Sequence, residues 1–415
     1  MRSVAYRAPG LVLTEHVFSL PLDHARPAGE QIEVFAREVV AAGKESDTLP
    51  WLVFFQGGPG YEAPRPLRHH TPGWLERALE EFRVLMLDQR GVGRSAPVGP
   101  EAASKRSAPQ LAERLTHFRA DSIVRDAELI RRELGVEQWS VLGQSFGGFC
   151  VVTYLSLFPE SLREALVCGG LAPLDRSIDE VYTATYRRTV EHVLRHYARY
   201  PGDRERVLQF VEQLEADDVR LPSGDRLTPR RFRQLGNLLG SGDGSEKLHY
   251  ILELPFGSPA FLDDVEYALP FARNPLYAVV HESCYAPGLP TNWAAQRLLP
   301  ARYAEDYSLL TGEHVYPWMF DEYAGLRPFA AAAEILAHHA WSPLYDVDAL
   351  AANDVPVAAA VYAEDMYVER EFSLETASRI KGLRAWLTSE YEHDGLTADG
   401  GKVLGRLLDL TRGRA

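Results

Sequence analysis

Residues 139–150 read Trp139-Ser-Val-Leu-Gly-Gln-Ser145-Phe-Gly-Gly-Phe-Cys150, and the rest of the chain is organised around this stretch. Its first residues form a short, mostly apolar run typical of a buried strand, and an apolar helical pattern follows the serine. A Gly-x-Ser-x-Gly pentapeptide lies between them. Strand, tight turn and helix in this order hold a serine in a strained conformation and push its hydroxyl out at the end of a sheet. The stretch therefore predicts that Ser145 is a nucleophile.

Length, composition and charge limit the classes of protein to consider. The chain has 415 residues, of which 46% are hydrophobic and 25% charged, as in soluble globular proteins. A formal net charge of −14 provides no basic stripe for phosphates, so we expect no nucleic-acid partner. No apolar signal segment or run of transmembrane length occurs, and the three cysteines are too few for a disulfide framework. We expect a cytoplasmic protein without membrane association.

Apolar runs and amphipathic helical patterns alternate on both sides of the pentapeptide, which predicts an α/β fold with a mostly parallel sheet. Two segments of alternating polarity near the N-terminus are expected to form an antiparallel hairpin. The predicted strands cover residues 11–20, 31–40, 51–55, 83–88, 139–142, 165–168, 355–363 and 383–388.

The alternation stops near Leu174, and the pattern is then mainly helical up to residue 343. The longest predicted helix in this region covers residues 179–200. We therefore predict three parts: residues 1–174 as the first part of the core, 175–343 as an inserted helical cap, and 344–415 as the second part of the core.

A serine nucleophile needs a general base, and the base needs a carboxylate that fixes its tautomer. In an α/β sheet these groups come from loops at the carboxyl ends of later strands. Asp365 directly follows the predicted strand 355–363, with Glu364 as an adjacent alternative, and His393 follows the last predicted strand. Serine, aspartate and histidine in this order match one known arrangement of catalytic triads.

An acyl-transfer site also needs backbone donors for the oxyanion. One is expected to be the amide of Phe146, immediately after the nucleophile. The other is expected at Gly57 or Gly58, because these residues follow a buried strand and leave the backbone uncovered.

Three motifs together resemble the proline iminopeptidase family of α/β-hydrolase serine peptidases. They are Gln-Gly-Gly-Pro-Gly at 56–60, Asp-Gln-Arg-Gly-Val-Gly-Arg-Ser at 88–95 and Gly-Gln-Ser-Phe-Gly-Gly at 143–148. Gln56 stands where the family has histidine, so the hydrogen bonding behind that loop must differ. The resemblance implies an α/β-hydrolase fold, with a mostly parallel central sheet flanked by helices and a large helical cap. It also implies release of an N-terminal proline, or a similar small residue, from peptides.

The same resemblance implies acids in the cap that hold the free amino group of the substrate. The segment at 281–285, His-Glu-Ser-Cys-Tyr, looks like the acid-containing cap segment of the family, so Glu282 is the first candidate. Glu313 and Glu322 are further candidates, as is Asp321, and Trp318 lies near them in the sequence. Solvated helix faces would also account for most of these acids.

No cofactor and no metal are expected. The run Gly91-Val-Gly-Arg-Ser-Ala96 fits a dinucleotide fingerprint, but Pro97 follows it where a helix should begin. His281 and Glu282 begin like a zinc-protease helix, yet Tyr285 stands in place of the second histidine.

Two alternatives to the peptidase stay open. An esterase or amidase acting on small-molecule esters or amides would use the same serine chemistry on the same scaffold. A ligand-binding protein could keep the fold without catalysis, although an apparently complete triad counts against it. The sequence leaves the oligomeric state open.

Overall fold

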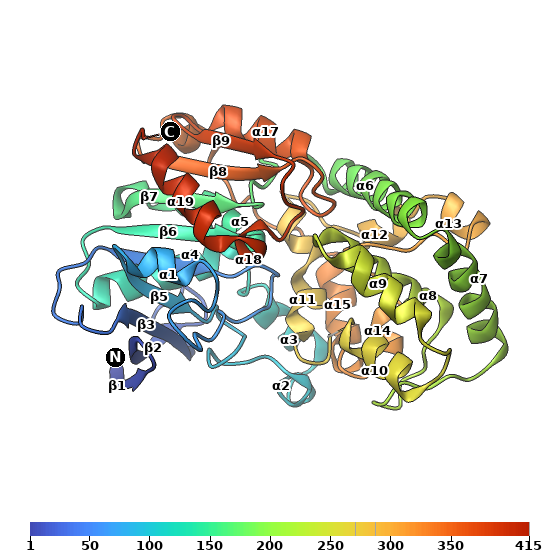
Figure 1. Ribbon diagram of the computed structural model, residues 1–415. Coiled ribbons are helices and arrows are strands. Elements are labelled where there is room, and N and C mark those ends of the chain that lie inside the picture. The colour runs from blue at the N-terminus through green and yellow to red at the C-terminus, as the bar shows by residue number, and fades with distance from the viewer. Residues whose placement is uncertain (270, 287, 415) are drawn as a thin grey trace.

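The computed structural model describes residues 1–269, 271–286 and 288–414, and within them the chain forms a nine-stranded sheet (Figure 1). The strand order is β1-β2-β3-β5-β4-β6-β7-β8-β9. The strands are β1 (Arg2–Ala8), β2 (Leu11–Pro21), β3 (Gln31–Ala41), β4 (Trp51–Phe55), β5 (Arg83–Leu87), β6 (Trp139–Gln144), β7 (Leu162–Cys168), β8 (Val357–Tyr362) and β9 (Arg384–Thr388). β1, β2, β3 and β5 pair antiparallel, and every pairing from β5 to β9 is parallel.

All eight predicted strands are confirmed, including the hairpin of β2 and β3. The first strand, β1, was not predicted. Almost all of its side chains are exposed, because it adds to the edge of the sheet and pairs there with β2 alone among the described strands. An exposed edge strand buries neither face, so it carries no alternating pattern that a sequence could reveal.

Helices cover both faces of the sheet, and alternate residues of each strand face opposite cores. Leu52 and Phe54 of β4 pack beneath α1 and α19, whereas Val53 and Phe55 pack against the side that carries α4 and α5. The helices of this part are α1 (Leu75–Leu79), α2 (Pro100–Ser104), α3 (Ala108–Leu115), α4 (Ala120–Glu133), α5 (Phe146–Leu157), α16 (Val347–Ala351), α17 (Arg370–Arg379), α18 (Gly395–Ala398) and α19 (Gly400–Thr411), with the 3₁₀ helix η1 (Pro159–Ser161).

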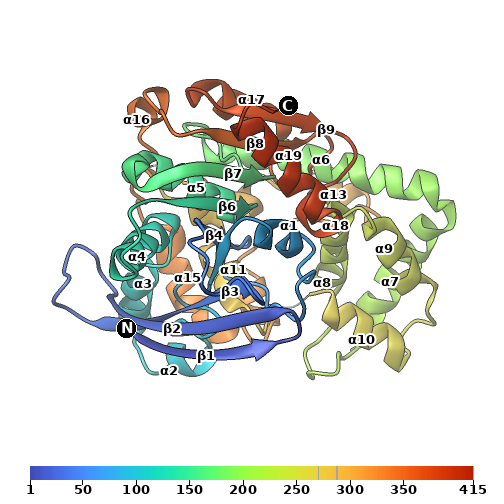
Figure 2. The ribbon, with the colours of Figure 1, turned by 60° about the vertical axis from the view of Figure 1, so that its left-hand side comes forward.

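The segment between β7 and β8 is helical, and Figures 1 and 2 show it gathered to one side of the sheet. It contains α6 (Ile178–Arg199), α7 (Pro201–Ala216), α8 (Pro229–Arg233), α9 (Gly244–Glu253), α10 (Pro259–Tyr267), α11 (Pro275–Val280), α12 (Ala294–Arg297), α13 (Arg302–Glu305), α14 (Met319–Glu322) and α15 (Ala330–Ala337), with the 3₁₀ helices η2 (Gln234–Gly240), η3 (Glu282–Tyr285) and η4 (Arg327–Phe329). We keep residues 175–343 as the proposed extent of the cap. Among the described helices, none combines the length and the apolar character needed to cross a bilayer.

Arg90, in the motif at 88–95, ties the hairpin to the helices. Its side chain is fully buried and donates to Asp126 of α4, with Nε 2.7 Å from Oδ2. The same guanidinium donates to the backbone oxygens of Leu22 at 2.7 Å and His117 at 2.8 Å. A buried carboxylate without its partner is strongly destabilising. The motif therefore has a structural task besides its place beside the serine.

Replacing Arg90 with methionine should lower the free energy of unfolding by about 3–5 kcal/mol, because the buried Asp126 loses its guanidinium partner and keeps only a contact with His24 at 3.0 Å. Urea unfolding followed by circular dichroism measures this change. The matched control is Arg94→Met on the same loop, where the arginine is half exposed and pairs with Glu15. It should lose about 1 kcal/mol or less. Equal losses in both variants would contradict the structural role of Arg90.

Candidate active site

Ser145 occupies a sharp turn between β6 and α5. Its backbone lies in the left-handed region, with φ 54° and ψ −125°, and its amide donates to Cys168 O at 2.9 Å. Gly147 lies against the end of β4, where a Cβ would overlap the carbonyl oxygen of Phe55. A Cβ at Gly143 would overlap the oxygen of Gly147. The glycines on both sides of the serine are therefore required by close backbone packing, which holds Ser145 in a strained conformation.

Asp365 and His393 meet at the ends of neighbouring strands β8 and β9. His393 Nδ1 lies 2.6 Å from Asp365 Oδ2. The other carboxylate oxygen, Oδ1, accepts the amides of Tyr367 at 2.8 Å and Val368 at 3.0 Å. Asp365 is almost fully buried, so these bonds fix the orientation of its carboxylate. The pair has the geometry of a histidine whose tautomer is set by an acid.

The electrostatic surroundings of His393 favour its protonated form. Burial by itself lowers the pKa of the imidazole, but the charge and the hydrogen bond of Asp365 outweigh it, so the pKa of His393 lies above its ordinary value. The imidazole is thereby suited to receive a proton during a reaction.

Two consecutive glycines, Gly169 and Gly170, pack against His393 and Ser145. A Cβ at Gly170 would overlap the carbonyl oxygen of Ser145, and a Cβ at Gly169 would come within 3.2 Å of His393 Nδ1. Both residues therefore lie against one short piece of backbone after β7. In the part of the chain that the structure describes, no hydrogen bond joins Ser145 Oγ to His393, and bonds of this kind often tighten only when substrate binds.

The glycine-rich loop after β4 faces the serine. A Cβ at Gly57 would lie 3.0 Å from Ser145 Cβ and 3.6 Å from its Oγ, so only glycine leaves this approach open. Phe146 is the first residue of α5, and its amide belongs to the helix N-terminus, which favours negative charge. Behind the loop, Gln89 Nε2 donates to the carbonyl oxygen of Gln56 at 2.9 Å. The amides of Gly57, Gly58 and Phe146 are thus arranged as candidates for an oxyanion hole.

A cavity of about 500 Å³ opens among the cap helices and reaches the glycine-rich loop. Its walls are mostly aromatic and aliphatic. Its lining includes Tyr61, Tyr250, Tyr267, Phe271, Tyr277 and Glu313. Tyr61 belongs to the loop that faces the serine, and its ring packs edge-on against Tyr277 of α11 with centroids 5.4 Å apart. The cavity has the size and the apolar character of a site for a small organic ligand.

Glu313 lines both this cavity and a smaller gap that Met366 and Tyr367, the residues after Asp365, also line. Burial raises its pKa to about 7, although the hydroxyl of Tyr277 donates to its carboxylate. The charges of His393 and Asp365 also act on Glu313, in opposite directions. Because Glu313 shares a gap with Met366 and Tyr367, it lies close to the loop that carries Asp365.

Several polar side-chain atoms beside Glu313 have no hydrogen-bond partner within the described residues. Tyr182, His281 and His314 line a narrow gap beside it. Within the described residues, the hydroxyl of Tyr182, both ring nitrogens of His281 and Nδ1 of His314 have no hydrogen-bond partner. Buried polar atoms of this kind are costly unless they serve a ligand or water. The sequence marks His281 only through the segment that contains Glu282, and nothing local distinguishes Tyr182 and His314 from core residues.

The structure places Glu282 in a different setting from Glu313. Glu282 is buried, and its Oε1 accepts the amide of Ala295 at 2.9 Å, at the start of α12. Burial raises the pKa of Glu282, and the backbone amides of α12 oppose that effect. One oxygen of this carboxylate is therefore already engaged by the cap itself.

Glu322 and Trp318 have partners elsewhere in the cap. Glu322 accepts from the Thr228 hydroxyl at 2.6 Å and pairs with Arg230 at 2.6 Å. The same arginine lies over the Trp318 ring, 4.7 Å from its centroid. Neither residue is among the described residues that line the cavity. The contacts of Glu322 and Trp318 favour a role in holding α8 against α14. The third acid of this segment, Asp321, is an exposed residue of α14.

Asp365→Asn should lower the pKa of His393, because the variant removes the charge that raises it. Titration of histidine ring carbons by NMR in a protein with ¹³C-labelled histidine measures the pKa. Glu364→Gln is the matched control, since this exposed neighbour makes no contact with His393 and should leave its pKa unchanged. An unchanged pKa in Asp365→Asn would contradict the geometry described above.

Comparison with known proteins identifies the family of this chain. A family model described as the alpha/beta hydrolase fold matches residues 50–256. A proline iminopeptidase from Aeromonas sobria is 48% identical over 420 residues, which cover 98% of each chain. A proline iminopeptidase from Aspergillus aculeatus is 33% identical, covering 99% of this chain and 96% of its own. These matches confirm the resemblance seen in the motifs. The chain belongs to the proline iminopeptidase family of α/β hydrolases.

Proposed function

We propose that this protein is a serine exopeptidase that releases N-terminal proline from peptides, with Ser145, His393 and Asp365 as its catalytic residues. The two relatives that match nearly the whole chain are both named proline iminopeptidases. The observation that carries the assignment of residues is the strained Ser145, which faces Gly57 while His393 is paired with Asp365 at 2.6 Å.

The geometry supports acyl transfer in two steps. Ser145 Oγ attacks the carbonyl carbon of the substrate while His393 Nε2 takes the hydroxyl proton, and Asp365 holds Nδ1–H in place. The amides near Gly57, Gly58 and Phe146 stabilise the negative oxygen of the tetrahedral intermediate. His393 then gives the proton to the leaving amine. A water molecule, activated by His393, attacks the acyl-enzyme and releases the free amino acid.

The cavity supports recognition of the N-terminal amino group by Glu313. This carboxylate lines the cavity and lies near His393, so an ammonium bound to it keeps the adjacent carbonyl close to the serine. An internal peptide bond has no ammonium to pair with a buried acid, which excludes it energetically. Glu282 stays a second candidate, with one oxygen occupied by Ala295. The apolar walls suit the ring of proline.

The proposed exopeptidase requires a free amino group on its substrate, whereas the alternative functions do not. An esterase or amidase of small molecules would use Ser145 without depending on Glu313. A ligand-binding protein would not react at Ser145 at all. The raised pKa of Glu313 and its place in the wall of the cavity favour a site for a cationic group.

Ser145→Ala should reduce turnover of proline p-nitroanilide by roughly 10⁴-fold or more, because no nucleophile remains. The assay is release of p-nitroaniline under steady-state conditions. Ser156→Ala is the matched control, since this buried serine lies on the same helix and donates only to Val152 O. Turnover by Ser145→Ala at the wild-type rate would contradict the assignment.

An N-blocked substrate tests whether the free amine is recognised. Acetyl-proline p-nitroanilide should be a much poorer substrate than the unblocked compound, because acetylation removes the charge that pairs with the cavity acid. A preference for the blocked compound, or for a simple ester, would support the small-molecule esterase or amidase instead. Absence of Ser145 labelling by a serine-reactive phosphonate would support the binding protein.

Glu313→Gln should raise KM for proline p-nitroanilide by roughly 30-fold, because the substrate ammonium loses its counter-ion. The pKa of Glu313 is about 7, so the carboxylate is neutral below and ionised above that pH. KM of the wild type should therefore fall as pH rises through 7, and the variant should lose this dependence. Glu322→Gln, whose carboxylate pairs with Arg230, is the control. An unchanged KM in Glu313→Gln would redirect the assignment to Glu282.

A further inference from the structure

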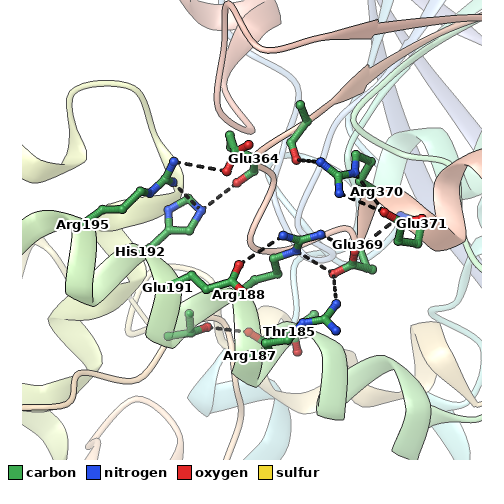
Figure 3. Close-up of polar contacts among 12 residues, drawn as sticks. Thr185, Arg187, Arg188, Glu191, His192, Arg195, Glu364, Glu369, Arg370 and Glu371 are labelled. Carbon is green, nitrogen blue, oxygen red and sulfur yellow. Dashed lines mark hydrogen bonds and ion pairs between the residues drawn. The ribbon is translucent and has the colours of Figure 1, made fainter.

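Helix α6 contacts both the inner end of the cavity and the loop that carries Asp365. Tyr182 and Thr185 of this helix line the gap beside Glu313, and Thr185 Oγ1 lies 3.1 Å from His314 Nε2. Further along the same helix, Arg188 and His192 point toward the loop after β8 (Figure 3). One rigid helix therefore connects the region of substrate recognition with the catalytic acid.

Arg188 and Glu369 form the most buried contact between α6 and this loop. Arg188 Nε lies 2.9 Å from Glu369 Oε2, and Nη2 lies 2.8 Å from Oε1, so the pair is bidentate (Figure 3). The side chain of Glu369 is 1% exposed and that of Arg188 is 12% exposed. Arg187 adds a longer contact of 3.6 Å to the same carboxylate. Two parallel hydrogen bonds in a largely buried pair fix the relative orientation of the two side chains as well as their distance.

Glu369 closes the turn that holds Asp365. The amides of Tyr367 and Val368, between the two acids, donate to Asp365 Oδ1. At the far end of the turn, Glu369 precedes the first residue of α17, and Arg370 donates to the oxygen of Ala363 at 3.0 Å. A displacement of Glu369 therefore moves the amides that orient the carboxylate of Asp365.

The same helix also supports the segment behind His393. His192 lies with Nε2 2.7 Å from Glu364 O and Nδ1 3.0 Å from Leu239 O. The next residue, Gly240, accepts the backbone amide of His393 at 3.0 Å. Contacts from α6 thus reach the backbone on both sides of the bond between Asp365 and His393.

We propose that Arg188 and Glu369 are a positioning pair, through which the cap holds Asp365 in the orientation that His393 needs for turnover. The inference rests on the catalytic roles proposed for Asp365 and His393. Replacing a buried ion pair with apolar side chains of similar volume often leaves stability unchanged or increases it, so stability alone gives little reason for this pair. A requirement that Asp365 be held in one precise orientation gives a better reason for the pair.

The test is the double variant Arg188→Met with Glu369→Leu, beside the two single variants. Each single variant removes the bidentate contact and leaves only Arg187 beside Glu369 or Glu191 beside Arg188, so it should lose thermal stability as well as turnover. The double variant should regain the melting temperature of the wild type. Its kcat for proline p-nitroanilide should nevertheless stay lower by roughly 10- to 100-fold, because the acid is held less precisely.

The pH profile separates positioning from a merely structural role. Asp365 raises the pKa of His393, so a weaker contact lets that pKa fall. The acid limb of kcat should therefore move to lower pH in the double variant, while KM and its dependence on Glu313 stay unchanged. A double variant that recovers both its stability and the kcat and pH profile of the wild type would overturn the proposal.

A second ion pair between the start of the cap and α17 provides the matched control. Arg176 contacts Glu375 through Nε at 3.0 Å and Nη2 at 2.9 Å, but both side chains are partly exposed and lie away from the Asp365 turn. Arg176→Met with Glu375→Leu should leave kcat and the pH profile unchanged. Equal losses of kcat in this control would show a general loosening of the cap and would overturn the assignment to Arg188 and Glu369.

Both double variants should be measured with p-nitrophenyl acetate as well, because this ester needs the serine, the histidine and the acid but no amine site. A wild type that cleaves the ester and no proline amide would contradict the exopeptidase proposal only. Reduced ester turnover in the Arg188 and Glu369 variant would then still support the positioning pair, and full ester turnover would contradict it.

Discussion

The site depends on the close approach of bare backbone around Ser145. Gly147 lies against Phe55 of β4, Gly170 lies against the serine carbonyl, and Gly57 faces the serine side chain. Any side chain at these positions would force the ends of the central strands apart. The approach stabilises a strained φ at Ser145 through the surrounding sheet, and it brings the backbone amides proposed for the oxyanion hole close to the serine.

The carboxylates of Asp365 and Glu313 have different surroundings, and their proposed tasks differ accordingly. Asp365 is engaged by His393 and by two backbone amides, so it is held in one orientation. Glu313 has a tyrosine hydroxyl as its hydrogen-bond donor, and burial raises its pKa to about 7. A fully satisfied carboxylate suits the orientation of a base, whereas a poorly compensated one suits the binding of a cation.

Helix α6 of the cap contacts two parts of the proposed site. α6 contacts the gap beside Glu313 and, through Arg188 and His192, the loop between β8 and α17. Because a helix is stiff over this length, a group bound near Glu313 and the acid at Asp365 share one support. The relative placement of recognition and chemistry then follows from the packing of a single element against the core.

The sequence by itself determined the strands from β2 to β9 and singled out Ser145, Asp365, His393 and the glycine-rich loop as candidates, because these features depend on local patterns and on the order of strands. The family followed from motifs near those same strands. Only the tertiary structure decided which cap acid faces the cavity. Glu282, Glu313 and Glu322 are equivalent as residue types, but an α12 amide engages the first and Arg230 the last. Their partners lie in separate helices and loops of the cap, so their roles depend on packing that no local pattern records.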